Sequence, residues 1–248
     1  MSKATDEEIA KLKEIIADSQ KIVFFGGAGV STESGIPDFR SKDGLYNQHD
    51  VRFDDYSPEY LLSDNCLFDE PKVFFEYYRQ KLDARKCKPN AAHKKLAEWE
   101  REGKLLGVIT QNIDGLHQKA GSKNVAELHG TTQECYCVAC GAEYGADYIF
   151  ESDRAVPRCE KCNDMVRPRV VLYGEELPEE AWDTASKWIA EADCLIISGT
   201  SLAVYPASTL PRRFSGKYLV VINHDVTDLD YIADLAIHDS VGKVLSKV

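Results

Sequence analysis

Short, nearly unbroken apolar runs are the main pattern in this sequence, and longer stretches of mixed polarity separate them. Four runs have the length of a strand and few polar interruptions: residues 21–25, 105–110, 194–198 and 218–222. An apolar run without alternation is typical of a strand that is buried on both faces. We therefore expect an α/β fold, in which helices cover both faces of a parallel sheet.

The segments between these runs carry helix signals. Thr5 and Glu8 have the spacing of a capping box at a helix start. The apolar residues that follow recur on one helical face: Ile9, Leu12, Ile15 and Ile16. Further helices are expected at residues 89–102 and 178–192. Residues 40–75 show little periodicity, so we expect a long loop with short helices that serves as a lid or pocket wall.

Two Cys-x-x-Cys pairs are separated by eighteen residues: Cys137, Cys140, Cys159 and Cys162. They predict a zinc site, because each pair forms a knuckle and four thiolates complete a tetrahedron. Gly141 and Asn163 follow the pairs, and both residue types tolerate the left-handed backbone that a knuckle needs. A disulfide-stapled loop is the alternative. Four thiolates leave no position for a catalytic water, so we expect one structural Zn²⁺ in a small inserted, zinc-ribbon-like domain.

Composition limits the class of protein. With 248 residues, the chain can form one substantial α/β domain and a small satellite. The sequence shows no apolar signal core at its N-terminus and no run long enough to cross a bilayer, so we expect a cytoplasmic protein without membrane contact. The net charge of −11 argues against direct nucleic-acid binding and favours cationic partners.

Two turns of small residues follow predicted strands. Gly26-Gly-Ala-Gly29 lies where a doubly wound sheet receives a pyrophosphate. Thr32 stands at the third fingerprint position, so a plain tight turn remains an equal alternative on these glycines alone. Gly199-Thr-Ser201 follows another strand, and Asn223 ends the next one, where it could bond a ribose. Two such turns at carboxyl ends of strands favour a bound nucleotide.

Three polar segments add candidate chemistry: Pro37-Asp-Phe-Arg40, Thr110-Gln-Asn-Ile-Asp114 and Leu128-His-Gly130. Taken singly, the histidine could be structural and the second segment only a polar turn. Together with the small-residue turns, the cysteine pairs, Arg167-Pro168 and Tyr173-Gly-Glu175, they resemble the sirtuin family of NAD-dependent protein deacylases, in its short bacterial or archaeal form. The resemblance extends from about residue 21 to residue 240.

The resemblance implies a large Rossmann-like domain joined to a small zinc domain, with NAD⁺ and an acyl-lysine entering the cleft between them. The large domain would comprise residues 1–39, 88–132 and 169–248. Residues 40–87 would form a helical and loop insertion that belongs to the small domain and the cofactor loop. Residues 133–168 would form the zinc-binding module.

The resemblance also implies the residues around NAD⁺. Those at the phosphates and the loop over the nicotinamide ribose would be Ala28, Gly29, Thr32, Phe39 and Arg40. Those forming the nicotinamide pocket and holding the ribose would be Gln111, Asn112, Ile113 and Asp114. Those lining the adenosine end would be Thr200, Ser201, Asn223 and Ser240.

In the implied reaction, the acyl oxygen of the substrate attacks the anomeric carbon as nicotinamide leaves, helped by proximity in a dry cleft. His129 is the expected general base for the ribose hydroxyls and a further cofactor contact, since its intrinsic pKa suits proton transfer near neutrality. Asn112 and Asp114, the other expected catalytic residues, would position ribose or water. A carboxamide is not a base, and a carboxylate beside developing positive charge stays ionised. The products would be acyl-ADP-ribose, nicotinamide and free lysine.

Acetyl-lysine-bearing proteins or peptides are expected to bind as an extended strand, mainly through main-chain hydrogen bonds. The implied substrate-binding residues are Val171, Leu172, Tyr173, Gly174, Glu175, Leu202 and Val204. Phe39 and Ile113 would add apolar walls around the lysine stem, unless they belong to the core. The family's Tyr-x-x-Arg pair for acidic acyl groups is missing around Arg79, so uncharged acyl groups are favoured.

Some features depart from this interpretation or leave it open. Arg169 places an unexplained charge beside the expected peptide strand, and Cys135 could compete with Cys137 as a zinc ligand. A mono-ADP-ribosyltransferase with the same pocket is an alternative function. A catalytically idle module that binds NAD or acyl-lysine is another, although Asn112, Asp114 and His129 together argue against it.

Overall fold

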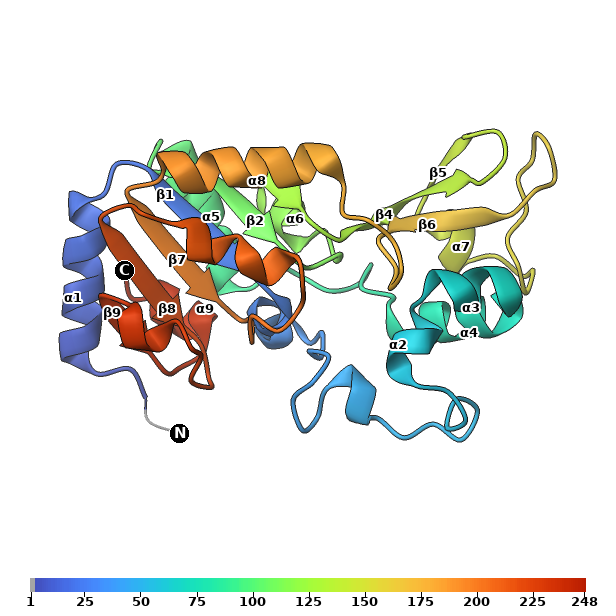
Figure 1. Cartoon of the computed structure of the whole chain (residues 1–248), viewed down its shortest axis with the longest axis horizontal. Helices are drawn as coiled ribbons and strands as arrows, with labels where there is room; N and C mark the ends of the chain where they lie inside the picture. The colour runs from blue at the N-terminus through green and yellow to red at the C-terminus, as the bar shows by residue number, and fades with distance from the viewer. Residues whose placement is uncertain (1–2) are drawn as a thin grey trace.

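The computed structural model describes residues 3–248 and contains two sheets, each with its own surrounding helices (Figure 1). The larger sheet has six parallel strands in the order β3-β2-β1-β7-β8-β9. Their bounds are β1 Ile22–Gly26, β2 Leu105–Thr110, β3 Val125–Glu127, β7 Cys194–Ser198, β8 Tyr218–Ile222 and β9 Leu235–Ile237. The four strands expected from the apolar runs are confirmed, and the short edge strands β3 and β9 complete the sheet.

Helices cover both faces of this sheet, as expected. They are α1 Asp6–Asp18, α5 Ala91–Arg101, α6 Leu116–Ala120, α8 Glu179–Glu191 and α9 Val241–Leu245. Phe24 belongs to the cluster that includes residues of α1, α5 and α9, whereas Phe25 belongs to the cluster that includes residues of α8. Neighbouring residues of β1 point to opposite faces of the sheet. Since helices cover both faces, both aromatic side chains are fully buried. The apolar run in β1 thus reflects two cores rather than one.

The expected helix starts are confirmed with small shifts. Thr5 and Glu8 form the capping box that begins α1. The helix expected at residues 89–102 begins at Ala91, because the Asn90 side chain accepts a hydrogen bond from the Ala92 N–H and caps it. No helix within the described part of the chain is long and apolar enough to cross a membrane.

The smaller sheet is antiparallel, with strand order β5-β4-β6. Its strands are β4 Gly130–Cys137, β5 Glu143–Gly145 and β6 Val166–Val170, and it carries the short helix α7 Asp147–Phe150. Three helices from the region of low periodicity pack beside it: α2 Pro58–Leu61, α3 Asp64–Asp69 and α4 Pro71–Lys81. Aromatic residues of α4 share one buried cluster with Cys135, Met165 and Val166. The exact domain boundaries given in the sequence analysis remain a prediction.

Two histidines lie inside the larger half of the molecule, one on α5 and one on α6. The rings of His93 and His117 are 4.7 Å apart between centroids, and both side chains are almost completely buried. Neither nitrogen of His117 has a hydrogen-bond partner among residues 3–248. Burial lowers the pKa of both imidazoles, and for His117 the neighbouring His93 lowers it further. Both rings are therefore neutral in the folded protein at neutral pH.

This pair should make the fold sensitive to acid. The unfolded chain takes up protons near pH 6.5, whereas the folded chain resists them, so the free energy of unfolding should fall as the pH drops below about 6.5. His117→Leu should weaken this dependence by up to about 1.4 kcal/mol per pH unit. Urea unfolding between pH 7 and pH 5 measures the slope. The matched control is His49→Gln, whose imidazole is 92% exposed, and equal slopes in the two variants would contradict the prediction.

Candidate functional site

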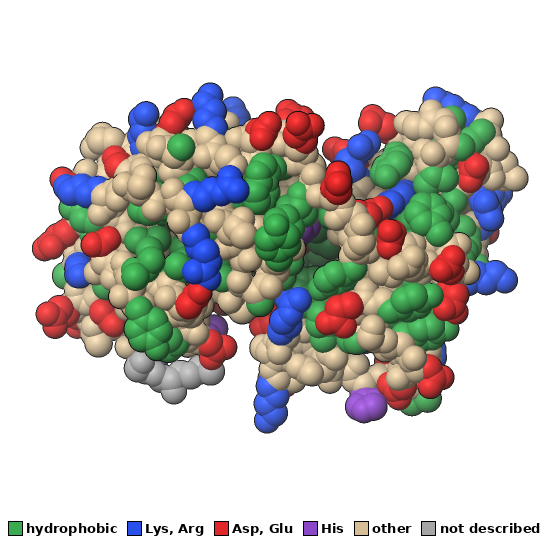
Figure 2. All heavy atoms as spheres, in the orientation of Figure 1, with side chains coloured by type: hydrophobic (Ala, Val, Ile, Leu, Met, Phe, Trp, Pro, Cys, Tyr) green, Lys and Arg blue, Asp and Glu red, His purple; other side chains and the backbone are tan. Residues whose placement is uncertain are grey.

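A cleft of about 480 Å³ lies at the carboxyl ends of the central parallel strands, where the two halves of the molecule meet, and Figure 2 shows a hollow there. The predicted cofactor residues that line it are Ala28, Gly29, Phe39, Arg40, Gln111, Asn112, Ile113, His129, Thr200, Ser201 and Asn223. The predicted substrate residues that line it are Val171, Leu172, Tyr173, Gly174, Glu175 and Val204. Thr32, Asp114, Leu202 and Ser240 do not line the cleft, and the structure places them behind or beside it.

The two small-residue turns contact each other directly, which the sequence did not indicate. The Gly29 N–H donates a hydrogen bond of 2.9 Å to the Gly199 carbonyl. A Cβ atom on Gly27 or Gly29 would lie only 2.7 Å from backbone atoms of Gly199. Glycine is thus required for the turns to approach each other. The chain then continues through two 3₁₀ turns, where the Thr32 hydroxyl donates to the Gly29 carbonyl at 2.9 Å, instead of a long helix.

Asn112 and Asp114 are joined through a residue that the sequence analysis missed. The Ser31 hydroxyl donates to Asp114 Oδ2 at 2.6 Å, and Asn112 Nδ2 donates to Ser31 Oγ at 3.0 Å. Asp114 Oδ1 accepts a hydrogen bond from the Leu116 N–H at 2.8 Å. Both Asp114 oxygens are therefore occupied, which fits a residue that orients Asn112. Ser31 could have been found only from its place in the first turn, within Gly29-Val-Ser-Thr32.

His129 lies immediately before β4, at the wall of the cleft. Its Nδ1 is 3.0 Å from the Gln111 carbonyl oxygen. Because a carbonyl can only accept, Nδ1 carries the proton in the neutral ring and Nε2 keeps its lone pair. Burial lowers the pKa of His129 below its usual value of 6.5, and the Gln111 hydrogen bond partly opposes this. The ring is therefore neutral at pH 7, with Nε2 able to take up a proton.

Elsewhere in the cleft, Thr200 is bonded to two of the other predicted residues, Gln111 and Asn223. Gln111 Nε2 donates to the Thr200 hydroxyl at 3.0 Å. Asn223 Oδ1 accepts from the Thr200 N–H at 3.2 Å, and Asn223 Nδ2 donates to the Thr200 carbonyl at 3.1 Å. The Asn223 amide thus holds the turn. Ser240 stands between the lining residues Asp239 and Val241, and its hydroxyl oxygen is 3.5 Å from His224 Nε2. The sequence did not predict that residues 224–227 line the cleft.

The segment 171–175 is held at its backbone on one side. The Val171 N–H donates to the His129 carbonyl, and the Tyr173 N–H donates to the Leu62 carbonyl, both at 2.9 Å. Among the described residues, the Val171 carbonyl and the Gly174 N–H have no hydrogen-bond partner. Leu202 has a left-handed backbone with φ of 56° and is buried with the α8 cluster, so it supports the cleft from behind.

A polar group of side chains occupies the wall formed by the loop after the first turn. Tyr46 and Tyr173 hydroxyl oxygens are 2.9 Å apart, and Arg40 donates to the Tyr173 hydroxyl at 3.3 Å. Tyr46 was not predicted, and it also packs edge-on against Phe39. Burial raises the pKa of Tyr46, so its hydroxyl stays protonated. Arg40 places a positive charge beside these two hydroxyls.

Three other arginines do not line the cleft and have partners outside it. Arg79 donates to the main-chain carbonyls of the small domain at Ile149, Arg154 and Ala155. Arg85 pairs with acidic side chains at Asp83, Asp147 and Glu151. Arg169 pairs with Glu134 and Glu143 across the small sheet and stacks over the Tyr136 ring. These ion pairs account for the unexplained charge of Arg169 on the exposed sheet.

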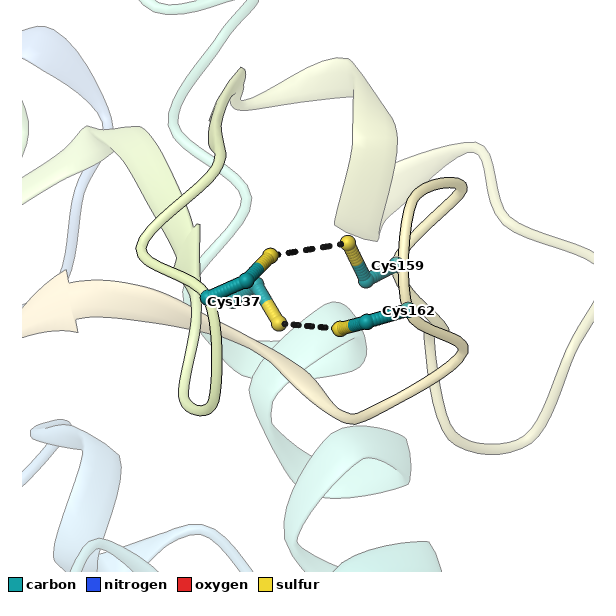
Figure 3. A group of neighbouring side chains, drawn as sticks. Cys137, Cys159 and Cys162 are labelled. Atoms are coloured by element: carbon teal, nitrogen blue, oxygen red, sulfur yellow. Dashed lines mark hydrogen bonds between the residues drawn. The ribbon is translucent and has the colours of Figure 1, made fainter.

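The four paired cysteines converge at the end of the small sheet. Figure 3 shows three of them, Cys137, Cys159 and Cys162, with their sulfur atoms turned toward the centre of the group. All four lie within 4.8 Å, with 3.3 Å between Cys137 and Cys162 and 3.6 Å between Cys140 and Cys159. Zn–S bonds of about 2.3 Å place tetrahedral sulfurs about 3.8 Å apart, whereas a disulfide needs about 2.05 Å. The donor set therefore fits a tetrahedral metal ion better than the disulfide alternative.

The backbone around these cysteines matches the sequence prediction. Gly141 and Asn163 have φ of 67° and 60°, and their N–H groups donate to the carbonyls of Cys137 and Cys159. Cys135 is turned away from the group, with its sulfur 3.0 Å from the Gly145 carbonyl oxygen.

Comparison with known proteins adds a family to this geometry. Residues 27–206 match the model of the Sir2 family. A Clostridium perfringens protein named NAD-dependent protein deacetylase is 54% identical over 245 residues, covering 98% of this chain and 99% of its own. A protein of the same name from Clostridium acetobutylicum is 51% identical over 242 residues, covering 98% of each chain.

Solved structures agree with this match. A Sir2 bound to acetylated peptide is 36% identical with a TM-score of 0.86, and a Sir2 with p53 peptide and NAD⁺ is 38% identical with a TM-score of 0.84. Each alignment covers 97% of this chain and 96% of the other. The match of family, sequence and structure over nearly the whole length shows that this chain belongs to the Sir2 family.

Proposed function

We propose that this chain is an NAD-dependent protein-lysine deacetylase. It transfers the acetyl group of a modified lysine to ADP-ribose and releases nicotinamide and the free lysine. The observation that carries this function is the identity of 54% and 51%, over nearly complete chains, to proteins named NAD-dependent protein deacetylase. Solved Sir2 structures named for acetylated or propionylated peptides support an acyl-lysine substrate, since they share its fold.

In the proposed reaction, the acetyl oxygen of the substrate attacks the anomeric carbon of the nicotinamide ribose, and the bond to nicotinamide breaks. His129 Nε2 then accepts the proton of a ribose hydroxyl, whose oxygen attacks the former acetyl carbon. Water completes the release, so that acetyl-lysine, NAD⁺ and water give lysine, nicotinamide and acetyl-ADP-ribose. The neutral ring held by the Gln111 carbonyl supports this role, because Nε2 has the lone pair that a base needs.

Asn112 serves as a positioning group, with its amide fixed through Ser31 and Asp114. The glycine turn and Arg40 contact the phosphates and the nicotinamide ribose, and Thr200 marks the adenosine end. A substrate peptide adds to segment 171–175 as an extended strand, using the free Val171 carbonyl and the Gly174 N–H. A cytoplasmic location and the absence of direct nucleic-acid binding remain predictions.

A mono-ADP-ribosyltransferase would use the same cleft with a different acceptor. Mass spectrometry of an acetyl-lysine peptide, incubated with the protein with and without NAD⁺, separates the two functions. Acetyl-ADP-ribose and free lysine in the NAD⁺ sample support deacetylation, whereas ADP-ribose attached to the protein acceptor supports the transferase. A peptide unchanged in both samples would favour the idle binding module.

A single Zn²⁺ is proposed for the cysteine group, held by Cys137, Cys140, Cys159 and Cys162. Four thiolate ligands give the ion a structural role, since they leave no open coordination position. The Tyr144 hydroxyl lies 3.1 Å from Cys159 Sγ and supports the ligand from outside the coordination shell.

Cys162→Ala should release the metal and destabilise the small domain, because the binding energy of such a site contributes to folding. Cys135→Ala is the matched control and should keep one zinc per chain, since its sulfur bonds the Gly145 carbonyl. Metal content by atomic emission and thermal unfolding measure both effects. Zinc retained in Cys162→Ala but lost in Cys135→Ala would show that the ligand assignment is wrong.

His129→Ala should leave NAD⁺ binding within a few-fold of the wild type and lower deacetylation by about 100-fold or more, the usual scale for loss of a general base. Binding is measured by calorimetry and turnover by nicotinamide release. His224→Ala is the comparison variant, since it changes another histidine that lines the same cleft. Turnover by His129→Ala that matches the wild type would remove this residue from the role of base.

Acyl preference follows from the partners that hold two arginines of the small domain away from the cleft. Arg79 and Arg85 are held by other partners, so a succinyl carboxylate would be left poorly paired, which costs several kcal/mol. We expect kcat/KM for a succinyl-lysine peptide to be about 100-fold below that for the acetyl peptide. Butyryl-lysine controls for size without charge. Equal values for succinyl and acetyl would mean that a cation, such as Arg40, meets the acidic group.

A further inference from the structure

The carboxylate of Glu175 does not face the cleft as a free group. Arg167, which lies on β6 and is only 4% exposed, donates to both Glu175 oxygens, one of them at 2.9 Å. Glu175 Oε2 also accepts a hydrogen bond from the Leu172 N–H at 2.8 Å. The same residue therefore pairs with a buried cation and with the backbone of the segment that precedes it.

This arrangement fixes how segment 171–175 presents its backbone. The Leu172 N–H is taken by the Glu175 carboxylate, and the Leu172 carbonyl accepts from the Glu175 N–H at 3.0 Å. Leu172 can therefore offer neither group to another strand. Gly174 turns the chain with φ of 98°, and a Cβ atom there would lie 2.5 Å from the Asp64 carboxylate. Among the described residues, the backbone groups of this segment without a hydrogen-bond partner are the Val171 carbonyl, the Gly174 N–H and the carbonyls of Gly174 and Glu175.

Arg167 is well anchored for such a role. Its guanidinium also donates to the Val170 carbonyl at 3.0 Å and to the Pro168 carbonyl at 3.3 Å, and it lies over the Tyr136 ring. A guanidinium with partners on every side cannot turn away, and its planar fork matches a carboxylate in two places. Removing the Glu175 carboxylate would leave the buried charge of Arg167 without its ionic partner.

We propose that the Arg167–Glu175 ion pair is a positioning device, which fixes the substrate-binding segment and selects the backbone groups that pair with the peptide. Glu175 thus acts through Leu172 instead of touching the substrate, which revises the contact expected from the sequence. This inference rests on the proposed function only for its kinetic consequence. The rigidity of the segment can be measured in any case.

The experiment compares Glu175→Gln with Glu176→Gln, a neighbouring exposed residue that loses the same charge. Glu175→Gln should raise the KM for an acetyl-lysine peptide about ten-fold, while kcat and the KM for NAD⁺ stay within two-fold, because the segment contacts peptide. Amide hydrogen exchange at Leu172 should become at least ten-fold faster. Glu176→Gln should match the wild type in all four readouts. Arg167→Lys, which keeps the charge but not the fork, should shift the same readouts in the same direction.

The outcomes separate the two claims. Unchanged Leu172 exchange in a folded, zinc-loaded Glu175→Gln protein would overturn the positioning device. Faster exchange with an unchanged peptide KM would overturn its effect on substrate. A wild-type protein that fails to deacetylate any acetyl peptide would refute the proposed function, and the exchange result would still decide whether the pair fixes the segment. If Glu175→Gln does not fold, Arg167→Lys gives the same comparison.

Discussion

The site depends on one backbone pairing, between Gly130 at the start of β4 and Val170 at the end of β6. The chain leaves the large sheet at the end of β3, just before Gly130, and after Val170 it passes through segment 171–175 and α8 before it rejoins that sheet at β7. A Cβ atom at Gly130 would lie 2.1 Å from the Arg169 carbonyl oxygen, and its φ of 71° also favours glycine. His129 precedes this pair and segment 171–175 follows it. The close approach therefore places the proposed base and the peptide segment side by side, joined by the Val171–His129 hydrogen bond.

The proposed zinc site lies at the other end of the same two strands. Cys137 pairs with Val166 in the antiparallel register, and the two knuckles close the sheet beyond this point. The ion would take no part in the chemistry, yet β4 and β6 connect it directly to Gly130 and Val170. Arg167 stands between the two ends. The proposed metal site and the start of the substrate segment thus lie at opposite ends of the strand pair β4 and β6.

The sequence predicted the parallel sheet and most of the cleft because these features are local. A buried strand is a short apolar run, and its carboxyl end is marked by the small or polar residues that follow. The parts that escaped prediction depend on partners distant along the chain. Ser31 bonds Asp114, Tyr46 meets Tyr173, and Gly29 contacts Gly199. Helices were predicted in the region of α4, but its bounds were not, because its aromatic residues pack against a sheet formed much later in the chain.

Burial lowers the pKa of three histidines, His93, His117 and His129, but their hydrogen-bond partners and their places in the fold give them different roles. For His93 and His117, the pKa is lowered mainly by loss of water, and for His117 the neighbouring His93 ring lowers it further. His129 is also buried, but the Gln111 carbonyl accepts its Nδ1–H and partly restores the pKa. The same carbonyl fixes the tautomer, and the same segment supplies Asn112. Of the three, His129 alone combines a fixed lone pair with a place in the cleft, which is why a base is better assigned to it than to its more deeply buried neighbours.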